Sequence, residues 1–449
     1  MGLGKKMQRV IKSLGVILLI LLFIAIGAGT YIFFHYPIGL PRDRIVRQEY
    51  LPFKSDDTPL SQAEVSEDIQ SLIEHTEQVH PIFLGEVSQR YTDAKERLLA
   101  LSDESMTVKE LKYHAFQYLA ALVDGHSFVY WNTPKALDID WAYQDGQLCL
   151  LDEDGQLTDK VIVEIAGLGI DTILGEIRKT FPAENDAAIQ QNVEKYAGNQ
   201  LFLESIGAKT SSTIPVTYEA QGERKTLNLG FYFVKEDSTS SFAELIEEDT
   251  AYIYISGFSD SIYFQNVLEH IEQYKNDGIK NYIIDVRKNA GGEYELVQAL
   301  LEAVGVKAPE YDRIIRFSPF AQQQKGYFRT QGTLRIKGNR NSYKEDAMQL
   351  YVLVDHNTFS AAQILTVVLK DAGFAKIVGQ YSSNSPSFYG NALAFQMENS
   401  RIMYQVSSEK LERPDKTKLD EEFLQPDIWV PYVEDALQIA LEDMRTPSA

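Results

Sequence analysis

The sequence contains a single cysteine, so it cannot form an intrachain disulfide. Cys149 lies within the apolar run Leu148–Leu151 and is expected to be a buried small hydrophobe, which argues against a cysteine nucleophile or thiolate-bound metal. Basic residues are also scarce, with 43 Lys and Arg against 64 Asp and Glu and a net charge of −21. Nucleic-acid binding needs clustered cations, so no such partner is expected. The zinc motif HExxH is absent, and we expect no metal and no organic cofactor.

The N-terminus carries a long run without charged side chains, from Leu14 to Phe34. At about 1.5 Å per residue, a helix of this length can cross a hydrocarbon core of roughly 30 Å. The small residues Ala25–Gly29 would suit a cleaved signal peptide, but the apolar run continues past them and favours an uncleaved anchor. Four basic residues precede the run and predict a cytoplasmic N-terminus with the remaining chain outside the cytoplasm: Lys5, Lys6, Arg9 and Lys12.

The predicted secondary structure of the remaining chain falls into three consecutive parts. Helical periodicity precedes Val123, a mixture of short strands and helices follows, and strands alternate with helices from Ala251 onward. Such alternation predicts an α/β layer fold with its site at the strand ends, in a chain of mixed α+β multi-domain type. The predicted parts are a basic tip with a transmembrane anchor, a linker, an N-terminal helical subdomain, a mixed insert and a catalytic core, over 1–36, 37–59, 60–137, 138–235 and 236–449.

Two turns in the predicted core could carry chemistry. The first follows the apolar strand Tyr351–Val354 and places Ser360 at the start of a helix. That serine could serve as a helix N-cap, or it could be a nucleophile beside the free amides of the first helical turn. The second turn contains Gly291 and Gly292 after the strand Tyr282–Val286, where paired glycines form either a structural turn or a close approach of amides to an oxyanion.

Three segments taken together resemble the C-terminal-processing (tail-specific) serine peptidase family: Asp285–Gly292, Thr358–Ala362 and Gln425–Ile428. The resemblance implies a crotonase-like β-α core, in which Ser360 is the nucleophile. It also implies an oxyanion hole formed by Gly291 or Gly292 with the amide of Ala361. The middle section stands where many family members carry a PDZ-like module; here it is a possible degenerate PDZ-like insert or a plain structural one.

The chain departs from the family at the general base. Processing peptidases pair the serine with a lysine, but Ser385 stands at that position and no lysine occurs between Lys376 and Lys410. The sequence is instead similar to the tricorn-like branch, which implies His126 as the base and Asp420 as the acid that orients it. His126 could alternatively end the helix before it, and His356 is a rival base. Glu421 or Glu422 could replace Asp420.

These observations predict a membrane-anchored, extracytoplasmic serine peptidase acting on proteins or peptides. Histidine titrates near neutral pH, so His126 can take the proton of the Ser360 hydroxyl while a carboxylate stabilises the imidazolium. Because the lysine is missing, a catalytically inactive ectodomain that binds peptides or other ligands is the alternative. Hydrolysis of small esters is a further possibility. The one predicted membrane contact is through the N-terminal helix.

Overall fold

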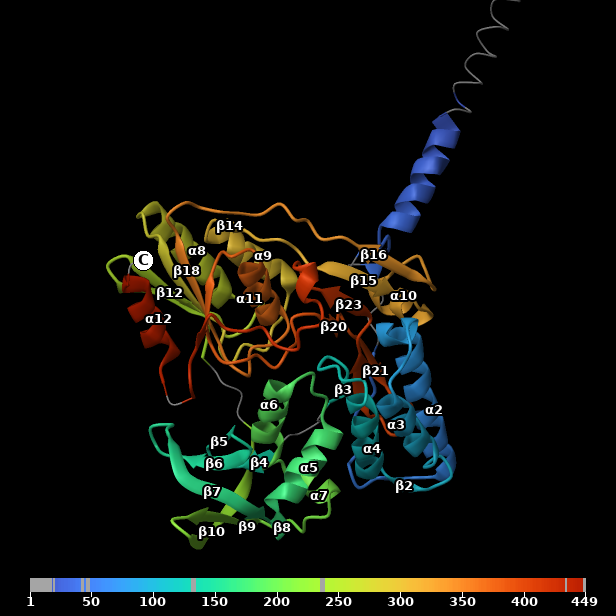
Figure 1. Cartoon of the computed structure of the whole chain (residues 1–449). Helices are drawn as coiled ribbons and strands as arrows, with labels where there is room; N and C mark the ends of the chain where they lie inside the picture. Colours follow the sequence, from blue (N-terminus) through green and yellow to red (C-terminus); the bar gives the residue numbers. More distant parts are fainter. Residues whose placement is uncertain are drawn as a thin grey trace, which may run out of the picture.

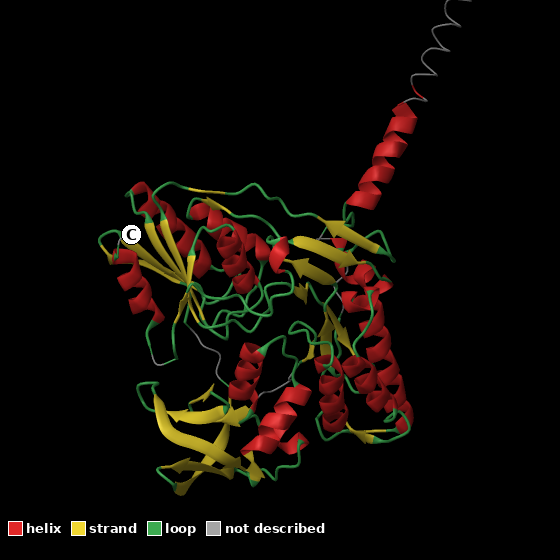
Figure 2. Ribbon diagram, in the orientation of Figure 1, coloured by secondary structure: helices red, strands yellow, loops and turns green. Residues whose placement is uncertain are grey.

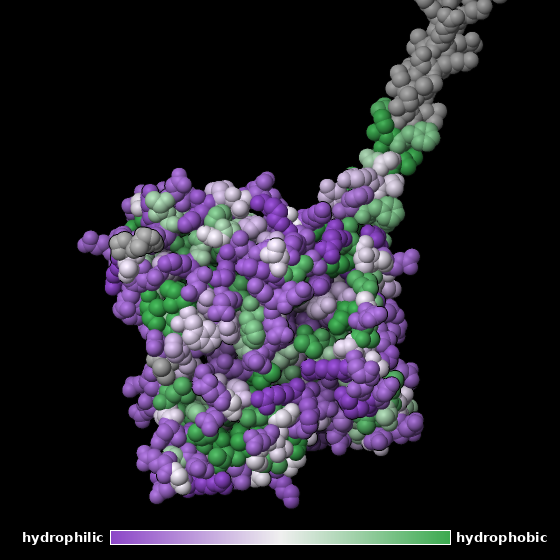
Figure 3. Space-filling model, viewed as in Figure 1, coloured by the Kyte–Doolittle hydropathy of each residue, from purple (hydrophilic) through white to green (hydrophobic). Residues whose placement is uncertain are grey.

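The structure is a computed structural model that describes residues 18, 21–41, 44–45, 49–130, 135–234, 239–432 and 434–446. Residues 21–35 are helical and project away from the rest of the molecule with apolar side chains on their surface (Figures 1 and 3). The predicted transmembrane segment begins at Leu14, outside the described residues. Within the part of the chain that the structure describes, no helix has the length and apolar character needed to cross a membrane.

The N-terminal helical part is built on amphipathic helices with well-defined starts. Capping boxes at Ser61 and Thr107 satisfy the free amides that begin α2 and α4. The predicted apolar faces, such as that of Ile69 and Leu119, are fully buried. The chain leaving α4 reaches β3, which pairs with β22 of the following part. The elements are β1 (Pro59–Leu60), α2 (Gln62–Val79), α3 (Gln89–Leu99), β2 (Met106–Thr107), α4 (Val108–Ala120) and β3 (Phe128–Val129), with a 3-10 turn at Pro81–Leu84.

The insert is an antiparallel sheet with helices beside it (Figures 1 and 2). Its strand order is β4-β10-β9-β7-β6-β5, and β8 pairs with β7. Strands β9 and β10 are adjacent in the chain and pair antiparallel as a hairpin. Helix α6 is the part of the insert that faces the catalytic core. The bounds are β4 (Lys135–Leu137), β5 (Trp141–Gln144), β6 (Gln147–Leu151), β7 (Leu157–Ile165), β8 (Leu168–Gly169), α5 (Ile170–Thr180), α6 (Asp186–Tyr196), α7 (Gln200–Ser205), β9 (Thr213–Ala220) and β10 (Glu223–Phe233).

The core is a six-stranded sheet in the order β11-β12-β13-β18-β19-β24, parallel except for β11. One apolar cluster includes residues of α8, α9 and α11, and a separate one includes residues of α12, so the sheet is covered on both faces (Figure 1). The alternation predicted from Ala251 onward is present, and the predicted strands Tyr282–Val286 and Tyr351–Val354 correspond to β13 and β18. The bounds are β11 (Phe242–Glu247), β12 (Thr250–Tyr254), α8 (Ile262–Asn276), β13 (Asn281–Asp285), α9 (Tyr294–Ala303), β18 (Gln349–Val354), α11 (Ala361–Asp371), β19 (Lys376–Gly379), β24 (Ile428–Trp429) and α12 (Ala436–Arg445).

Smaller sheets connect this core to the N-terminal helices. One has the order β16-β15-β23-β20, another the order β21-β22-β3, and β14 pairs with β17. Through β3, the segment that follows α4 is held against the core, which brings the loop of His126 to the carboxyl ends of β13 and β18. The bounds are β14 (Val306–Lys307), β15 (Asp312–Arg316), α10 (Pro319–Lys325), β16 (Thr333–Ile336), β17 (Tyr343–Lys344), β20 (Phe388–Gly390), β21 (Leu393–Gln396), β22 (Met403–Val406) and β23 (Glu409–Glu412).

Candidate active site

Ser360 lies in the tight turn between β18 and α11. Its backbone has φ 54° and ψ −117°, a conformation that non-glycine residues adopt only when their surroundings hold it. Its side chain makes no N-cap hydrogen bond, so the structure does not use this serine as a cap. Instead, the Ser360 hydroxyl lies 2.9 Å from Nε2 of His126. The turn therefore directs the hydroxyl toward a base rather than toward its own helix.

His126 comes from the loop between α4 and β3, and its ring is fixed by aromatic neighbours. It stacks on Phe359 with ring centroids 4.5 Å apart and on Phe388 with centroids 5.3 Å apart. Burial lowers the pKa of His126 below its ordinary value, and the charge of Asp124 opposes this shift only in part. The imidazole is therefore neutral at neutral pH, which is the form that can accept a proton from Ser360.

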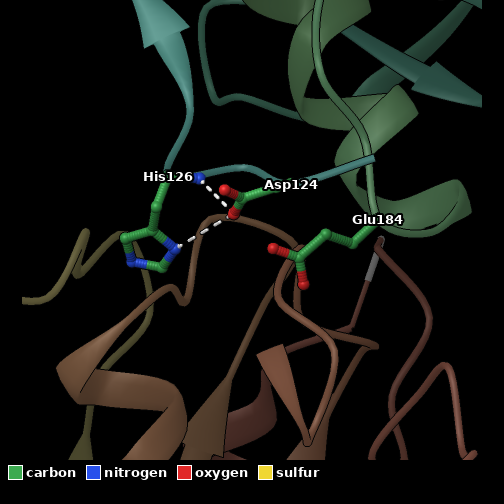
Figure 4. A group of neighbouring side chains, drawn as sticks. All are labelled: Asp124, His126 and Glu184. Carbon is green, nitrogen blue, oxygen red and sulfur yellow. Dashed lines mark hydrogen bonds and ion pairs between the residues drawn. The ribbon is translucent and has the colours of Figure 1, made fainter. Parts of the chain in front are cut away.

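Asp124, two residues before His126, is the carboxylate beside this imidazole (Figure 4). Its Oδ1 lies 4.0 Å from Nδ1 of His126 and accepts the His126 backbone N–H at 2.9 Å. Its Oδ2 lies 3.0 Å from Nε2 of His80 and accepts the Ser127 hydroxyl at 2.5 Å. Burial alone would raise the pKa of Asp124, but the hydrogen bond and charge of His80 hold it below its ordinary value. Asp124 is therefore a fixed negative charge next to the base.

The acid predicted from the family resemblance lies elsewhere. Asp420 is exposed, and no contact joins it to His126 among the residues that the structure describes. The segment after the 3-10 turn at Lys416–Lys418 leaves Asp420 at the surface, while Glu421 reaches inward to the buried Arg413 at 2.5 Å. Glu422 contributes only its carbonyl oxygen, to Asn185. None of these three acids lies at the imidazole, and the structure brings Asp124 there instead.

The rival base His356 is engaged with the insert. Its Nε2 lies 2.7 Å from Glu194 on α6, and the residue is 4% exposed. Burial alone would lower the pKa of His356, but Glu194 holds it above its ordinary value. Nε2 of His356 is thus engaged by Glu194, whereas Nε2 of His126 lies at the Ser360 hydroxyl, so the structure favours His126 as the base.

The three predicted oxyanion residues lie together around Ser360. The amide of Gly291 donates to the side chain of Asn289 at 2.8 Å, so it already has a partner. The amides of Gly292 and Ala361 have no hydrogen-bond partner among the described residues. Ala361 begins α11. The first amides of a helix have no partner within it, and the positive end of the helix dipole lies there. The pair of amides that remains available for a developing oxyanion is Gly292 with Ala361.

Gly291 is required for a different reason, namely close approach. Its φ is +101°, and a Cβ atom placed there would lie 2.5 Å from Cβ of Ser360. Replacing Gly291 with alanine is therefore expected to add about 1–3 kcal/mol of backbone strain and to displace Ser360, lowering kcat about 100-fold. Thermal unfolding and peptide hydrolysis measure the two effects. An alanine variant with wild-type kcat would show that Gly291 is merely a turn residue.

Sequence reasoning did not identify Glu184, which the insert places next to Asp124 (Figure 4). One carboxylate oxygen accepts the Gly125 amide at 3.1 Å, and the other accepts Nδ2 of Asn384 and the amide of Ser385, each at 2.8 Å. Ser385 stands at the position of the missing lysine, and its backbone amide thus donates to the Glu184 carboxylate. Removal from water, followed by the charge of Asp124, raises the pKa of Glu184 to about 8.

This raised pKa predicts a pH dependence of stability. Glu184 has an ordinary pKa of 4.5 and a folded-state pKa of about 8, so between these values the folded protein holds a proton that the unfolded chain has lost. The contribution of Glu184 to folding is therefore most favourable below pH 4.5 and declines as the pH rises toward 8. We expect wild type to lose stability relative to Glu184→Gln between pH 5 and pH 8 in urea unfolding. A difference that does not vary with pH would contradict the assignment.

Asp124, His126 and Glu184 also form the one group of potential metal ligands found in the described part of the chain, with donor atoms within 4.8 Å of one another. The four carboxylate oxygens already accept hydrogen bonds from six donors: the amides of Gly125, His126 and Ser385 and the side chains of His80, Ser127 and Asn384. These contacts are those of a hydrogen-bonded network rather than of an open coordination site.

Comparisons with known proteins found a family model and a curated relative that match parts of this chain. The model of peptidase family S41 matches residues 249–430. The carboxy-terminal processing protease CtpB of Bacillus subtilis (strain 168) is 27% identical over 248 residues, which is 51% of this chain and 48% of that protein. The chain thus spans about half the length of this curated relative.

Solved structures extend the likeness to most of the fold. Mature CPAF is similar with a TM-score of 0.58 and 14% identity, over 82% of this chain and 93% of that chain. Mature CPAF complexed with lactacystin gives a TM-score of 0.59 at 14% identity, over 85% and 97% of the two chains. At this identity the likeness concerns the fold alone. With the family match, it leads to one conclusion: the chain carries a serine-type peptidase domain of family S41 over residues 249–430.

Proposed function

We propose that this protein is a serine peptidase that hydrolyses peptide bonds in protein or peptide substrates through an acyl-enzyme on Ser360. The observation that carries the proposal is the 2.9 Å contact between the Ser360 hydroxyl and Nε2 of His126, two residues 234 positions apart in the sequence. A neutral imidazole at this distance can take the serine proton as the hydroxyl attacks a carbonyl carbon, and the same nitrogen can then protonate the leaving amine.

The other residues support the charges that form during this reaction. The amides of Gly292 and Ala361 are available to stabilise the oxyanion, an interaction worth about 3–4 kcal/mol per donor. Asp124 stabilises the imidazolium by its charge at 4.0 Å. Water, deprotonated by His126, then attacks the ester carbonyl; the acyl group leaves as a carboxylic acid, and His126 returns the proton to the Ser360 oxygen.

A fluorophosphonate probe tests this proposal directly. The intact protein should form a covalent adduct, and mass spectrometry of a digest should place it on the peptide that contains Ser360. Cleavage of a peptide library and of small esters then identifies the preferred substrate class. Absence of an adduct, or an adduct at another serine, would refute the mechanism and favour the inactive ligand-binding alternative.

We further propose that the N-terminal helix anchors the protein in a membrane, with the catalytic domain on the extracytoplasmic side. Support comes from the uncharged run between Leu14 and Phe34 and from the four basic residues before it. The apolar side chains of this helix are also exposed, as at Phe23 with 69% and Ile24 with 61%. Deleting residues 1–36 should move the protein from the membrane fraction to the soluble fraction. Retention of the truncated protein in the membrane would contradict the anchor.

A further inference from the structure

Glu184 belongs to the insert, in the short segment between α5 and α6, yet both of its carboxylate oxygens contact loops of the active site. One oxygen accepts the amide of Gly125, between Asp124 and His126, at 3.1 Å. The other accepts two donors of the turn at Asn384 and Ser385, each at 2.8 Å. The Glu184 side chain therefore joins the loop that carries His126 to the turn at Asn384 and Ser385, which contacts Ser360.

The contact with Asn384 determines how that amide is oriented. Because Nδ2 of Asn384 donates to Glu184, its Oδ1 must face the opposite side, where it accepts the backbone N–H of Ser360 at 2.9 Å. Asn384 is completely buried and cannot exchange these partners for water. Were the amide to turn over, Nδ2 would face the Ser360 N–H, and two donors would oppose each other.

The hydrogen bond to Ser360 matters because of the backbone it holds. Ser360 has a positive φ of 54°, and such conformations persist only when neighbouring contacts determine them. Phe359 donates to the carbonyl of Asn289 at 2.9 Å, and Gln363 donates to the carbonyl of Asn384 at 2.8 Å. The turn at Asn384 and Ser385 thus holds the segment of Ser360 at two points, the Ser360 amide and the Gln363 side chain. Glu184 in turn holds this turn through its two hydrogen bonds.

We propose that Glu184 is a positioning residue of the peptidase, which fixes the distance between His126 and Ser360 by binding the loops that carry or support them. The active site is therefore composite, with the nucleophile from the core, the base from the helical subdomain and the positioning carboxylate from the insert. The inference rests on the proposed function for its kinetic consequences, but the hydrogen bonds themselves can be tested without activity.

Glu194 offers a matched control for the test. It is also a glutamate of the insert that contacts the core, through Nε2 of His356 at 2.7 Å, but it touches neither the Gly125 loop nor the Asn384 turn. Substitution with glutamine at each position replaces one carboxyl group with an amide of the same size at the interface between insert and core. Only Glu184→Gln disturbs the contacts around Ser360 and His126.

The kinetic experiment uses the full-length protein and a peptide substrate. Glu184→Gln should lower kcat about 10- to 100-fold with KM changed less than twofold, because the reacting groups are misplaced and the substrate surface is not. Glu194→Gln should change kcat less than threefold. Combining Glu184→Gln with Asn384→Ala should lower kcat by less than the product of the two single effects, since the two residues share one hydrogen bond. Equal effects of the two glutamine variants, or additive effects in the double variant, would overturn the proposal.

Hydrogen exchange provides the measurement that does not need catalysis. Glu184→Gln should speed the exchange of amides in residues 382–386 and 124–126 at least tenfold relative to wild type and Glu194→Gln. If wild type neither cleaves peptides nor reacts with the fluorophosphonate, the peptidase proposal fails, and the exchange rates still decide the role of Glu184. Unchanged exchange in both segments would refute the positioning role even in an active enzyme.

Discussion

Replacing His126 with alanine is expected to lower the rate of Ser360 acylation by about 10⁴- to 10⁶-fold. Without a base 2.9 Å from the hydroxyl, the serine attacks as a neutral alcohol, and the general-base contribution to the rate is lost. The measurement is the second-order rate of fluorophosphonate labelling, with peptide hydrolysis alongside. Since burial lowers the pKa of His126, wild-type labelling should decline only below the ordinary histidine pKa of 6.5.

His356→Gln serves as the control for this experiment. It removes the other histidine near the nucleophile turn and breaks the contact with Glu194, while His126 remains in place. We expect its labelling rate to stay within about threefold of wild type. The assignment of the base would be wrong if His356→Gln abolished labelling and His126→Ala did not.

The sequence allowed the core elements to be predicted closely because their signals are local. The apolar strand that became β18 and the helix that became α11 lie next to each other in the chain, so the turn carrying Ser360 follows from them. The sequence also showed the pair Gly291 and Gly292. It did not show which of their two amides is free to bind an oxyanion. That depends on the side chain of Asn289, which takes the amide of Gly291.

The acidic residues could not be predicted in the same way. Asp420 came from a resemblance that aligned its position with the family, but the chain there keeps the carboxylate at the surface. Asp124 lies only two residues before His126, but its role depends on contacts with His80 that no local pattern reveals. Glu184 lies 59 or more positions from every active-site residue it contacts, so only the folded chain places it.

The proposed mechanism does not need the missing lysine. A Ser–Lys pair needs one long side chain close to the nucleophile. In the proposed mechanism, the neutral imidazole of His126 takes the proton and the buried carboxylate of Asp124 stabilises the resulting charge. At the position of the lysine, the Ser385 amide instead helps to bind Glu184. In this chain, the position of the missing lysine is thus part of the hydrogen-bond network around Glu184.

Asp124→Asn is expected to lower kcat by about 10³-fold, whereas Asp420→Asn should leave it within twofold of wild type. Opposite unit charges 4.0 Å apart attract by about 4 kcal/mol at an effective dielectric constant of 20, and Asp124 is fully buried at this distance from the imidazole that becomes charged. Ser127→Ala, which removes one hydrogen bond to the same carboxylate but keeps its charge, should lower kcat less than tenfold. If Asp420→Asn instead caused the larger loss, the acid inferred from the family would act in catalysis through a conformation that differs from this one.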